Sequence, residues 1–133
     1  MTLGVRALVA NADGEILLVR HSYVSGWHLP GGGVERGETL RAALTRELKE
    51  EGGVTLEGEP SLFAVYYNSK GSPRDHVALF VVRAFRQDAE FRPNAEIFDR
   101  RFFPPNKLPA DTTAATRQRI AEVLEGVAIN EYW

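Results

Sequence analysis

Three glutamates, Glu47, Glu50 and Glu51, have a spacing that suggests chemistry. They stand at positions i, i+3 and i+4 of a predicted helix, which places them on one face at about 100° per residue. Two carboxylates about 6 Å apart repel each other by roughly 3 kcal/mol at an effective dielectric of about 20. A bound cation would remove this repulsion. Because the ligands offer only oxygen, the site suits Mg²⁺ or Mn²⁺ better than Zn²⁺.

The alternative is an ordinary solvated helix face, on which Arg46 pairs with Glu50 at i, i+4 for a few tenths of a kcal/mol. The surrounding residues argue against it. Residues 32–54 read GGVERGETLRAALTRELKEEGGV and match every fixed position of the pattern G-x5-E-x7-R-E-U-x-E-E-x-G-U, where U is a bulky aliphatic residue. The stretch resembles the motif of the Nudix hydrolase family (MutT-like). The resemblance extends more loosely to residues 27–31, to Glu96 and Ile97, and to residues 101–104.

The resemblance implies a metal-dependent hydrolase that cleaves a pyrophosphate bond in a nucleoside diphosphate linked to another group, with Mg²⁺ or Mn²⁺ as cofactor. It assigns Glu47, Glu50 and Glu51 to the metal, together with Gly31. The same three glutamates and Arg46 are the expected catalytic residues. We expect Arg46 to orient the carboxylates through bidentate contacts rather than to react.

Two roles stay open at this level. The resemblance implies a general base that is Glu50 or Glu51, with Glu96 as a candidate outside the motif. Glu96 follows a polar stretch, and its alternative role is an ordinary charge at the start of a strand. Glu38 is either a further metal ligand or a negative charge that favours the N-terminus of the helix.

Substrate contacts are predicted outside the motif. Aromatic rings could stack on a base, although aromatic residues in strands usually belong to the core. Cationic side chains could contact phosphate, although a histidine at the start of a strand usually caps a turn. The candidates are Arg20, Tyr23, Trp27, Tyr66, Arg74 and His76.

The elements that must position these residues follow from periodicity and turn signals. Residues 3–10 and 15–20 predict a hairpin around the Asp-Gly turn at residues 11–14. A helix is expected from Glu38 to about Gly52, with Thr39 near its start, and a second one over residues 112–127, capped by Asp111 or Thr112. Further strands are expected at residues 54–56, 61–67, 76–85 and 96–103. This order predicts an α/β class protein, an α/β/α sandwich with a mixed sheet and a loop-helix-loop motif.

Length and composition restrict the function further. The 133 residues fit one domain, 1–133, and the net charge of −2 gives no general attraction to nucleic acid or to an anionic membrane. The absence of cysteine excludes disulfides and thiolate chemistry. We therefore expect a cytoplasmic monomer or homodimer that acts on a small nucleotide, with 5′-triphosphate RNA as a further substrate class to test.

The small size also slightly favours (d)NTPs or related small nucleotides, since there is no room for an added substrate domain. The rival function is a non-catalytic Nudix-like domain that binds a nucleotide as a sensor. Such domains tend to lose the motif carboxylates, whereas this sequence retains Glu47, Glu50 and Glu51.

Overall fold

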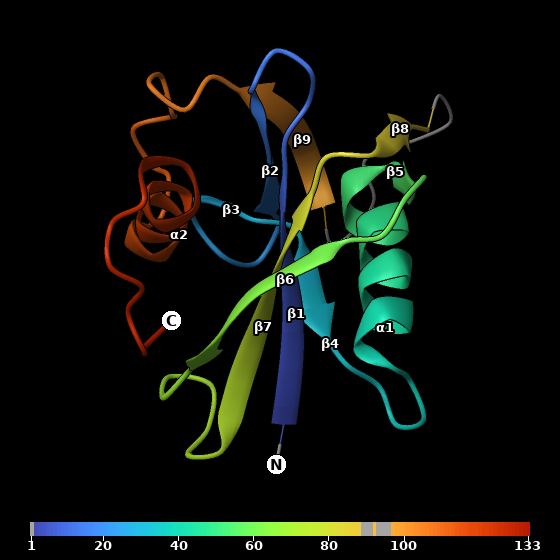
Figure 1. Ribbon diagram of the computed structural model, residues 1–133, viewed down its shortest axis with the longest axis vertical. Coiled ribbons are helices and arrows are strands. Elements are labelled where there is room, and N and C mark those ends of the chain that lie inside the picture. Colours follow the sequence, from blue (N-terminus) through green and yellow to red (C-terminus); the bar gives the residue numbers. More distant parts are fainter. Residues whose placement is uncertain (1, 89–91, 93–96) are drawn as a thin grey trace.

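A computed structural model describes residues 2–88, 92 and 97–133 of the chain. Helix α1 (Leu40–Glu47) and helix α2 (Ala114–Glu125) lie on opposite sides of the β-strands, as Figure 1 shows. The predicted α/β/α sandwich with a mixed sheet is thereby confirmed. Among the described residues, no helix is both long enough and apolar enough to span a membrane.

The largest sheet has the strand order β4-β1-β7-β6. Strand β1 pairs parallel with β7 and antiparallel with β4, while β6 pairs antiparallel with β7. Two smaller sheets have the orders β3-β2-β9 and β5-β8. The strands are β1 (Thr2–Val9), β2 (Ile16–His21), β3 (Trp27–His28), β4 (Gly31–Gly33), β5 (Val54–Leu56), β6 (Ser61–Tyr67), β7 (Asp75–Val82), β8 (Phe85–Gln87) and β9 (Ile97–Phe103).

The hairpin predicted from the first two apolar runs is confirmed only at its turn, and the two strands do not pair along their length. Strand β1 pairs with β4 and β7, whereas β2 pairs with β3 and β9. Within the described residues, the β-bridge between the two apolar runs is antiparallel and joins Ala10 to Ile16, beside the turn. Both strands carry buried apolar residues on both faces, as central strands do. Each strand therefore lies between two neighbours of its own, and the two strands belong to different sheets.

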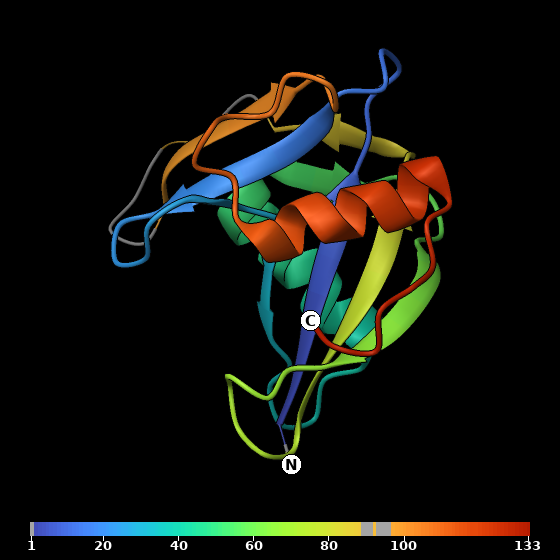
Figure 2. The ribbon, with the colours of Figure 1, turned by 90° about the vertical axis from the view of Figure 1, so that its left-hand side faces the viewer.

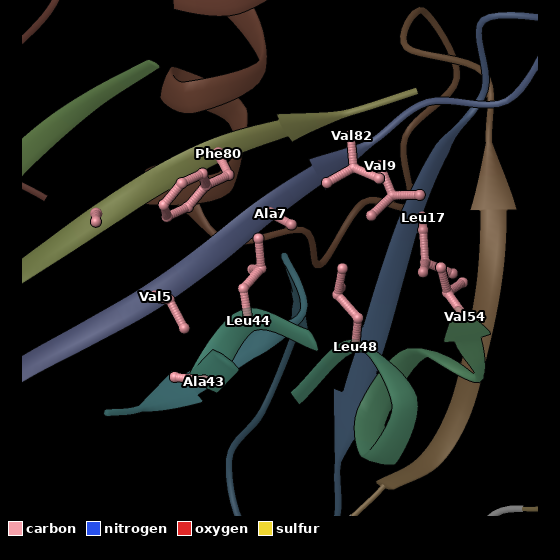
Figure 3. Close-up of a cluster of buried hydrophobic side chains, with 11 residues drawn as sticks. Val5, Ala7, Val9, Leu17, Ala43, Leu44, Leu48, Val54, Phe80 and Val82 are labelled. Atoms are coloured by element: carbon pink, nitrogen blue, oxygen red, sulfur yellow. The ribbon is translucent and has the colours of Figure 1, made fainter. Parts of the chain in front are cut away.

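Helix α1 is held against β1 by one hydrophobic cluster. Figure 3 shows Leu44 of α1 and Leu48, which directly follows the helix, pointing toward the strands. Both side chains are fully buried and pack with Val5, Ala7 and other apolar residues of the cluster. Burying a leucine stabilises a fold by roughly 1.5–3 kcal/mol. The core therefore fixes the rotation of the helix about its axis, and with it the direction of the neighbouring glutamates.

The predicted helix over the motif is interrupted before its end. Thr39 caps α1, since its hydroxyl accepts a hydrogen bond from the Ala42 N–H. After Glu47 the chain continues as a π-helical turn, η1 (Leu48–Gly52). It ends at Gly53, whose backbone φ is +61° and whose N–H donates to the Leu48 carbonyl oxygen five residues earlier. Such π-turns change the direction of the following side chains and occur frequently at functional sites.

Two smaller predictions also need correction. The apolar run expected as one strand over residues 76–85 divides into β7 and β8, and β8 pairs with β5 instead of extending the large sheet. Helix α2 is capped by Thr113, not by Asp111 or Thr112, because the Thr113 hydroxyl accepts from the Thr116 N–H at 3.2 Å. Glu96 lies outside the described residues.

Candidate active site

Arg46, on α1, organises the motif. Its Nε and Nη2 donate to the two carboxylate oxygens of Glu38 at 2.9 and 2.8 Å, and its Nη1 donates to Glu47 Oε1 at 2.7 Å. Nη2 also donates to the Gly33 carbonyl oxygen at 3.0 Å. The structure thus contains the expected bidentate contact, but it is made to Glu38.

Glu38 has a role that neither sequence alternative described. Besides binding Arg46, its Oε1 accepts from the Glu35 N–H at 2.8 Å. The hydrogen bonds from Arg46, followed by that from Glu35, lower the pKa of the Glu38 carboxyl to about 2. Conversely, Glu38 and Glu47 raise the pKa of Arg46. The Arg46–Glu38 pair is therefore charged at neutral pH and fastens the loop before α1 to the helix.

Glu47 is buried beside the glycine-rich strand β4. A Cβ atom at Gly32 would lie 2.5 Å from the Glu47 Cδ, so the carboxyl occupies space that a side chain would otherwise fill. Burial raises the pKa of Glu47, while the hydrogen bond from Arg46 opposes the shift. Burial thus disfavours the charged form of this carboxyl, and a further cation beside it would stabilise that form.

Glu51 is buried on the π-turn and contacts the same strand. Its Oε1 accepts a hydrogen bond from the Gly31 N–H at 3.0 Å, and its Oε2 lies 3.9 Å from His21 Nε2. Burial, assisted by the charge of Arg6, lowers the pKa of His21 to about 4, so this imidazole is neutral at pH 7. Only glycine fits at position 31, because a Cβ atom there would overlap the Val5 carbonyl oxygen.

Glu50 differs from its two neighbours. Its side chain is 62% exposed, and its Oε2 lies 3.7 Å from Arg46 Nη1. The three glutamates nevertheless line one cavity of about 460 Å³, which we call the acidic cavity. The described residues that line it are Arg6, His21, Tyr23, Gly31, Gly32, Gly33, Glu35, Arg46, Glu47, Glu50 and Glu51.

The acidic cavity fits a hard divalent cation by the chemistry of its donors. Carboxylate and carbonyl oxygens are the ligands that Mg²⁺ and Mn²⁺ prefer. The space kept clear at Gly32 admits the Glu47 carboxyl, whose charge is incompletely solvated. Among the described residues, no three histidine or acidic side chains are gathered closely enough to hold a metal ion. Arg46 contacts Glu47 and approaches Glu50, and these carboxylates would have to reorient before they could share an ion.

A second cavity, of about 230 Å³, shares Arg6 with the acidic cavity, and we call it the aromatic cavity. Its lining comprises Arg6, His28, Leu29, Tyr67, Asn68, Ser69, Lys70, Thr113, Ala115, Thr116, Tyr132 and Trp133. Arg6 belongs to both cavities, and its Nη1 donates to the Leu29 carbonyl oxygen at 2.9 Å. Our sequence analysis missed Arg6. The available signal was a single cation within the apolar run of the first strand.

Of the predicted substrate contacts, the structure brings only Tyr23 to the acidic cavity. Arg20 instead pairs with Asp111 at 2.9 Å, and its guanidinium lies 5.4 Å from the Trp27 ring centroid. Trp27 is buried in the second hydrophobic cluster, beneath α2. Both residues therefore stabilise the fold around β3.

The remaining three candidates are also placed elsewhere. Tyr66 is fully buried, and its hydroxyl donates to Glu122 Oε1 at 2.6 Å. His76 is the second residue of β7, where its Nδ1 lies 3.3 Å from the Arg74 carbonyl oxygen, as expected for a residue beside a turn. The described residues that line the two cavities include neither Arg74 nor His76. Two aromatic residues that line the second cavity, Tyr132 and Trp133, were not among our candidates.

Replacing Gly32 with alanine is expected to reduce activity more than stability. The new Cβ would meet the carboxyl end of Glu47, a flexible group that can move aside at small cost to the fold. The displaced Glu47 carboxyl would, however, no longer occupy the position in which Arg46 holds it. We expect kcat/KM to fall by about tenfold or more, as for other residues that orient ligands, with the melting temperature nearly unchanged. Gly33→Ala is the matched control, because a Cβ there has no neighbour within 4 Å.

Comparison with known proteins identifies the family. A family model described as NUDIX domain matches residues 1–124. The ADP-ribose pyrophosphatase of Methanocaldococcus jannaschii is 34% identical over 104 residues, which cover 76% of this chain and 61% of that protein. An RNA pyrophosphohydrolase of Halorhodospira halophila is 48% identical over 50 residues, which cover 38% of this chain and 28% of that protein. The chain thus spans less than two thirds of the length of either relative.

Solved structures agree with this assignment. The crystal structure of a MutT NUDIX hydrolase from Burkholderia pseudomallei is 29% identical and superimposes with a TM-score of 0.75. The match covers 96% of this chain and 98% of that one. The fold, the motif over residues 32–54 and the family model therefore agree, and this chain belongs to the Nudix hydrolase family.

Proposed function

We propose that this chain hydrolyses a pyrophosphate bond in a nucleoside diphosphate linked to another group. The observation that carries the proposal is the adjacency of the two cavities, with Arg6 lining both. A substrate that spans them would place its diphosphate beside Glu47, Glu50 and Glu51 and its organic part among aromatic rings. The names of the similar proteins, a pyrophosphatase and a pyrophosphohydrolase, support the same chemistry.

Nudix hydrolases generally need divalent metals, and we propose Mg²⁺ or Mn²⁺ for this chain. Glu47, Glu50 and Glu51 would hold the ion, with the Gly31 carbonyl oxygen as a further donor. When bound, the ion neutralises charge on the diphosphate and favours attack by water on phosphorus. Arg46 keeps the Glu47 carboxyl in position. His21 is neutral at pH 7 and adds no charge to the cavity.

Glu50 is the base that we favour over Glu51. Its carboxylate is the solvent-accessible one of the three, whereas Glu51 is buried and accepts a hydrogen bond from Gly31. In the hydrolytic step, the water oxygen bonds to phosphorus, its proton passes to the carboxylate, and the bond from phosphorus to the bridging oxygen breaks. Glu96 stays an alternative base, since it lies outside the described residues.

We favour (d)NTPs or related small nucleotides as substrates. At about 230 Å³, the aromatic cavity is smaller than the roughly 300–1,000 Å³ of pockets that enclose drug-sized ligands, so it suits one base better than an extended chain. Arg6 lies between the cavities, where it can contact phosphate. 5′-Triphosphate RNA is the substrate class to compare, given the RNA pyrophosphohydrolase among the similar proteins. The cytoplasmic location and the monomeric or dimeric state stay predictions.

A substrate screen tests the proposed function. The purified protein is incubated with Mg²⁺ or Mn²⁺ and with NTPs, oxidised dNTPs, ADP-ribose, nucleotide sugars, dinucleoside polyphosphates and 5′-triphosphate RNA. We expect turnover of one class, complete loss of it with EDTA, and recovery when Mg²⁺ is added. Hydrolysis in ¹⁸O-labelled water then locates the phosphorus that is attacked. Nucleotide binding without hydrolysis would contradict the proposal and support a sensor domain.

A further inference from the structure

The chain turns back after α2, and residues 130–133 run beside the end of β6, as Figure 2 shows from the α2 side. The Tyr67 N–H donates to the Glu131 carbonyl oxygen at 2.8 Å, and the Trp133 N–H donates to the Tyr67 carbonyl oxygen at 2.9 Å. Tyr67 and Tyr132 form a parallel bridge. Because β6 is an edge strand of the large sheet, residues 130–133 cover part of an edge that would otherwise be unpaired. We call them the 130–133 segment.

A buried carboxylate on α2 fastens the segment to the core. Glu122 accepts hydrogen bonds from the Asn130 N–H at 2.9 Å and from the Tyr66 hydroxyl at 2.6 Å. It also pairs with Arg119 at 3.0 Å, and both charged side chains are almost completely buried. A buried ion pair contributes little net stability but is costly to break, because one charge is then left without a partner. The segment is thus attached through contacts that tolerate little displacement.

Arg119 fixes the last two residues of the segment. Its Nη1 donates to the Tyr132 carbonyl oxygen at 3.1 Å. Its guanidinium also lies 4.2 Å from the ring centroid of Tyr66 and 5.1 Å from that of Trp133. The Tyr66 and Trp133 rings meet edge to face at 5.4 Å. Cation–π and edge contacts of this kind restrict ring orientation, so the position of Trp133 is set from within the core.

The other side of the segment forms part of the aromatic cavity. Tyr132 and Trp133 line it together with Tyr67, and the Tyr67 and Tyr132 ring centroids are 5.7 Å apart. Arg6 lines both this cavity and the acidic cavity. Aromatic faces attract planar bases, whereas phosphate is drawn to the cation. We therefore expect a bound nucleotide to lie with its base toward the 130–133 segment and its phosphates toward Arg6.

We propose that the 130–133 segment is the wall that recognises the base of the substrate, with Tyr132 and Trp133 as specificity-determining residues. Glu122 and Arg119 are positioning residues that hold this wall. The inference rests on the proposed function, since it assigns the base-recognising part of the same site. It assigns this role to residues that are far from the motif in the sequence and that bridge to the sheet at Tyr67.

Tyr132→Ala tests the wall. The side chain is 57% exposed, so the replacement should leave the fold intact. For the best nucleotide of the screen, we expect KM to rise by roughly tenfold, within the range for the loss of one base-stacking ring, and kcat to change by less than about twofold. Ile129→Ala is the matched control, because Ile129 is a neighbouring, 50% exposed apolar residue that does not line the cavity. An unchanged KM in Tyr132→Ala, or an equal rise in Ile129→Ala, would overturn the inference.

A binding measurement keeps the wall testable even if no nucleotide is hydrolysed. Nucleotide is titrated against the protein in Mg²⁺ while tryptophan fluorescence is recorded. Stacking on Trp133 should quench the emission, and Trp133→Phe should remove most of the response, because the other tryptophan, Trp27, is buried in the core. Quenching without turnover would refute the proposed hydrolysis and retain the wall. Turnover together with quenching that persists in Trp133→Phe would support the proposed hydrolysis and refute the wall.

Glu122→Gln tests the positioning role. Glutamine preserves the size of the side chain but removes the charge that pairs with Arg119. We expect KM to rise severalfold with kcat nearly unchanged, and the melting temperature to fall. Gln118→Ala is the control, since Gln118 also donates a hydrogen bond to Glu122, at 3.1 Å, but forms none with the 130–133 segment in the described part of the chain. A lower melting temperature with KM unchanged would show that Glu122 is structural only.

Discussion

Replacing Glu51 with glutamine is expected to lower kcat by on the order of a thousandfold with little change in the fold. The carboxylate is a proposed metal ligand, and stabilisation of transition-state charge by a bound ion is worth several kcal/mol, at about 1.4 kcal/mol for each factor of ten. The amide keeps an oxygen that can accept the hydrogen bond from the Gly31 N–H. It loses only the negative charge, and the effect on activity can thus be separated from the effect on packing.

Two companion variants sharpen this test. Glu50→Gln changes a carboxylate that is 62% exposed, so it is expected to abolish turnover at no cost in stability. Glu125→Gln alters an exposed glutamate on α2, away from both cavities, and should behave as wild type. The measurements are kcat with the best substrate of the screen, the melting temperature and the circular dichroism spectrum. Undiminished turnover in Glu50→Gln and Glu51→Gln would refute the assignment of the site.

The sequence predicts the parts of this protein that depend on local spacing. Thr39 begins the motif helix because its hydroxyl can cap the next turn, and Gly53 ends it because glycine tolerates a positive φ. The apolar positions Leu44 and Leu48 correctly indicate the buried face. These signals lie within a few residues of the atoms that they control, so they are visible without knowledge of the fold.

The direction of the glutamates was harder to predict. Ideal α-helical spacing would place the side chains of Glu47, Glu50 and Glu51 on one face. The π-turn changes the directions of Glu50 and Glu51 relative to Glu47. Glu47 and Glu51 are buried against β4, and Glu50 faces solvent. The cause is tertiary, because Gly32 and Gly31 bring the strand close enough to contact the two carboxyls. Helical periodicity alone contains no information about that strand.

The substrate side of the site was largely missed for a related reason. Arg6, Tyr67 and Tyr132 come from β1, β6 and the 130–133 segment, and they meet only through sheet pairing. Aromatic residues in strands give the same pattern whether they line a cavity or fill the core. Tyr66 and Tyr67 are adjacent in the sequence, yet Tyr66 is fully buried and Tyr67 lines the aromatic cavity. Strand alternation sends them to different surroundings, and only the three-dimensional contacts tell them apart.

Arg46→Lys is expected to weaken metal binding and activity by roughly 10–100-fold, although the charge is preserved. The guanidinium bonds both oxygens of Glu38, one oxygen of Glu47 and the Gly33 carbonyl. A lysine ammonium is a single point charge and cannot maintain this planar arrangement. Glu47 would then be free to rotate in the acidic cavity. Arg41→Lys is the matched control on the same helix, since Arg41 is exposed and pairs only with Glu59 among the described residues.

The Mg²⁺ dependence of activity distinguishes positioning from general loss of stability. If Arg46 orients the ligands, the Mg²⁺ concentration for half-maximal activity rises in Arg46→Lys, and excess Mg²⁺ restores part of the rate.

Acid titration gives a second readout, because Arg46 holds the folded-state pKa of Glu38 near 2, below its ordinary value of 4.5. The Glu38 contribution to stability is complete above pH 4.5 and is lost as the pH falls toward 2. That loss should be smaller in Arg46→Lys, whereas an unchanged Mg²⁺ dependence and acid profile would show that Arg46 does not position the carboxylates.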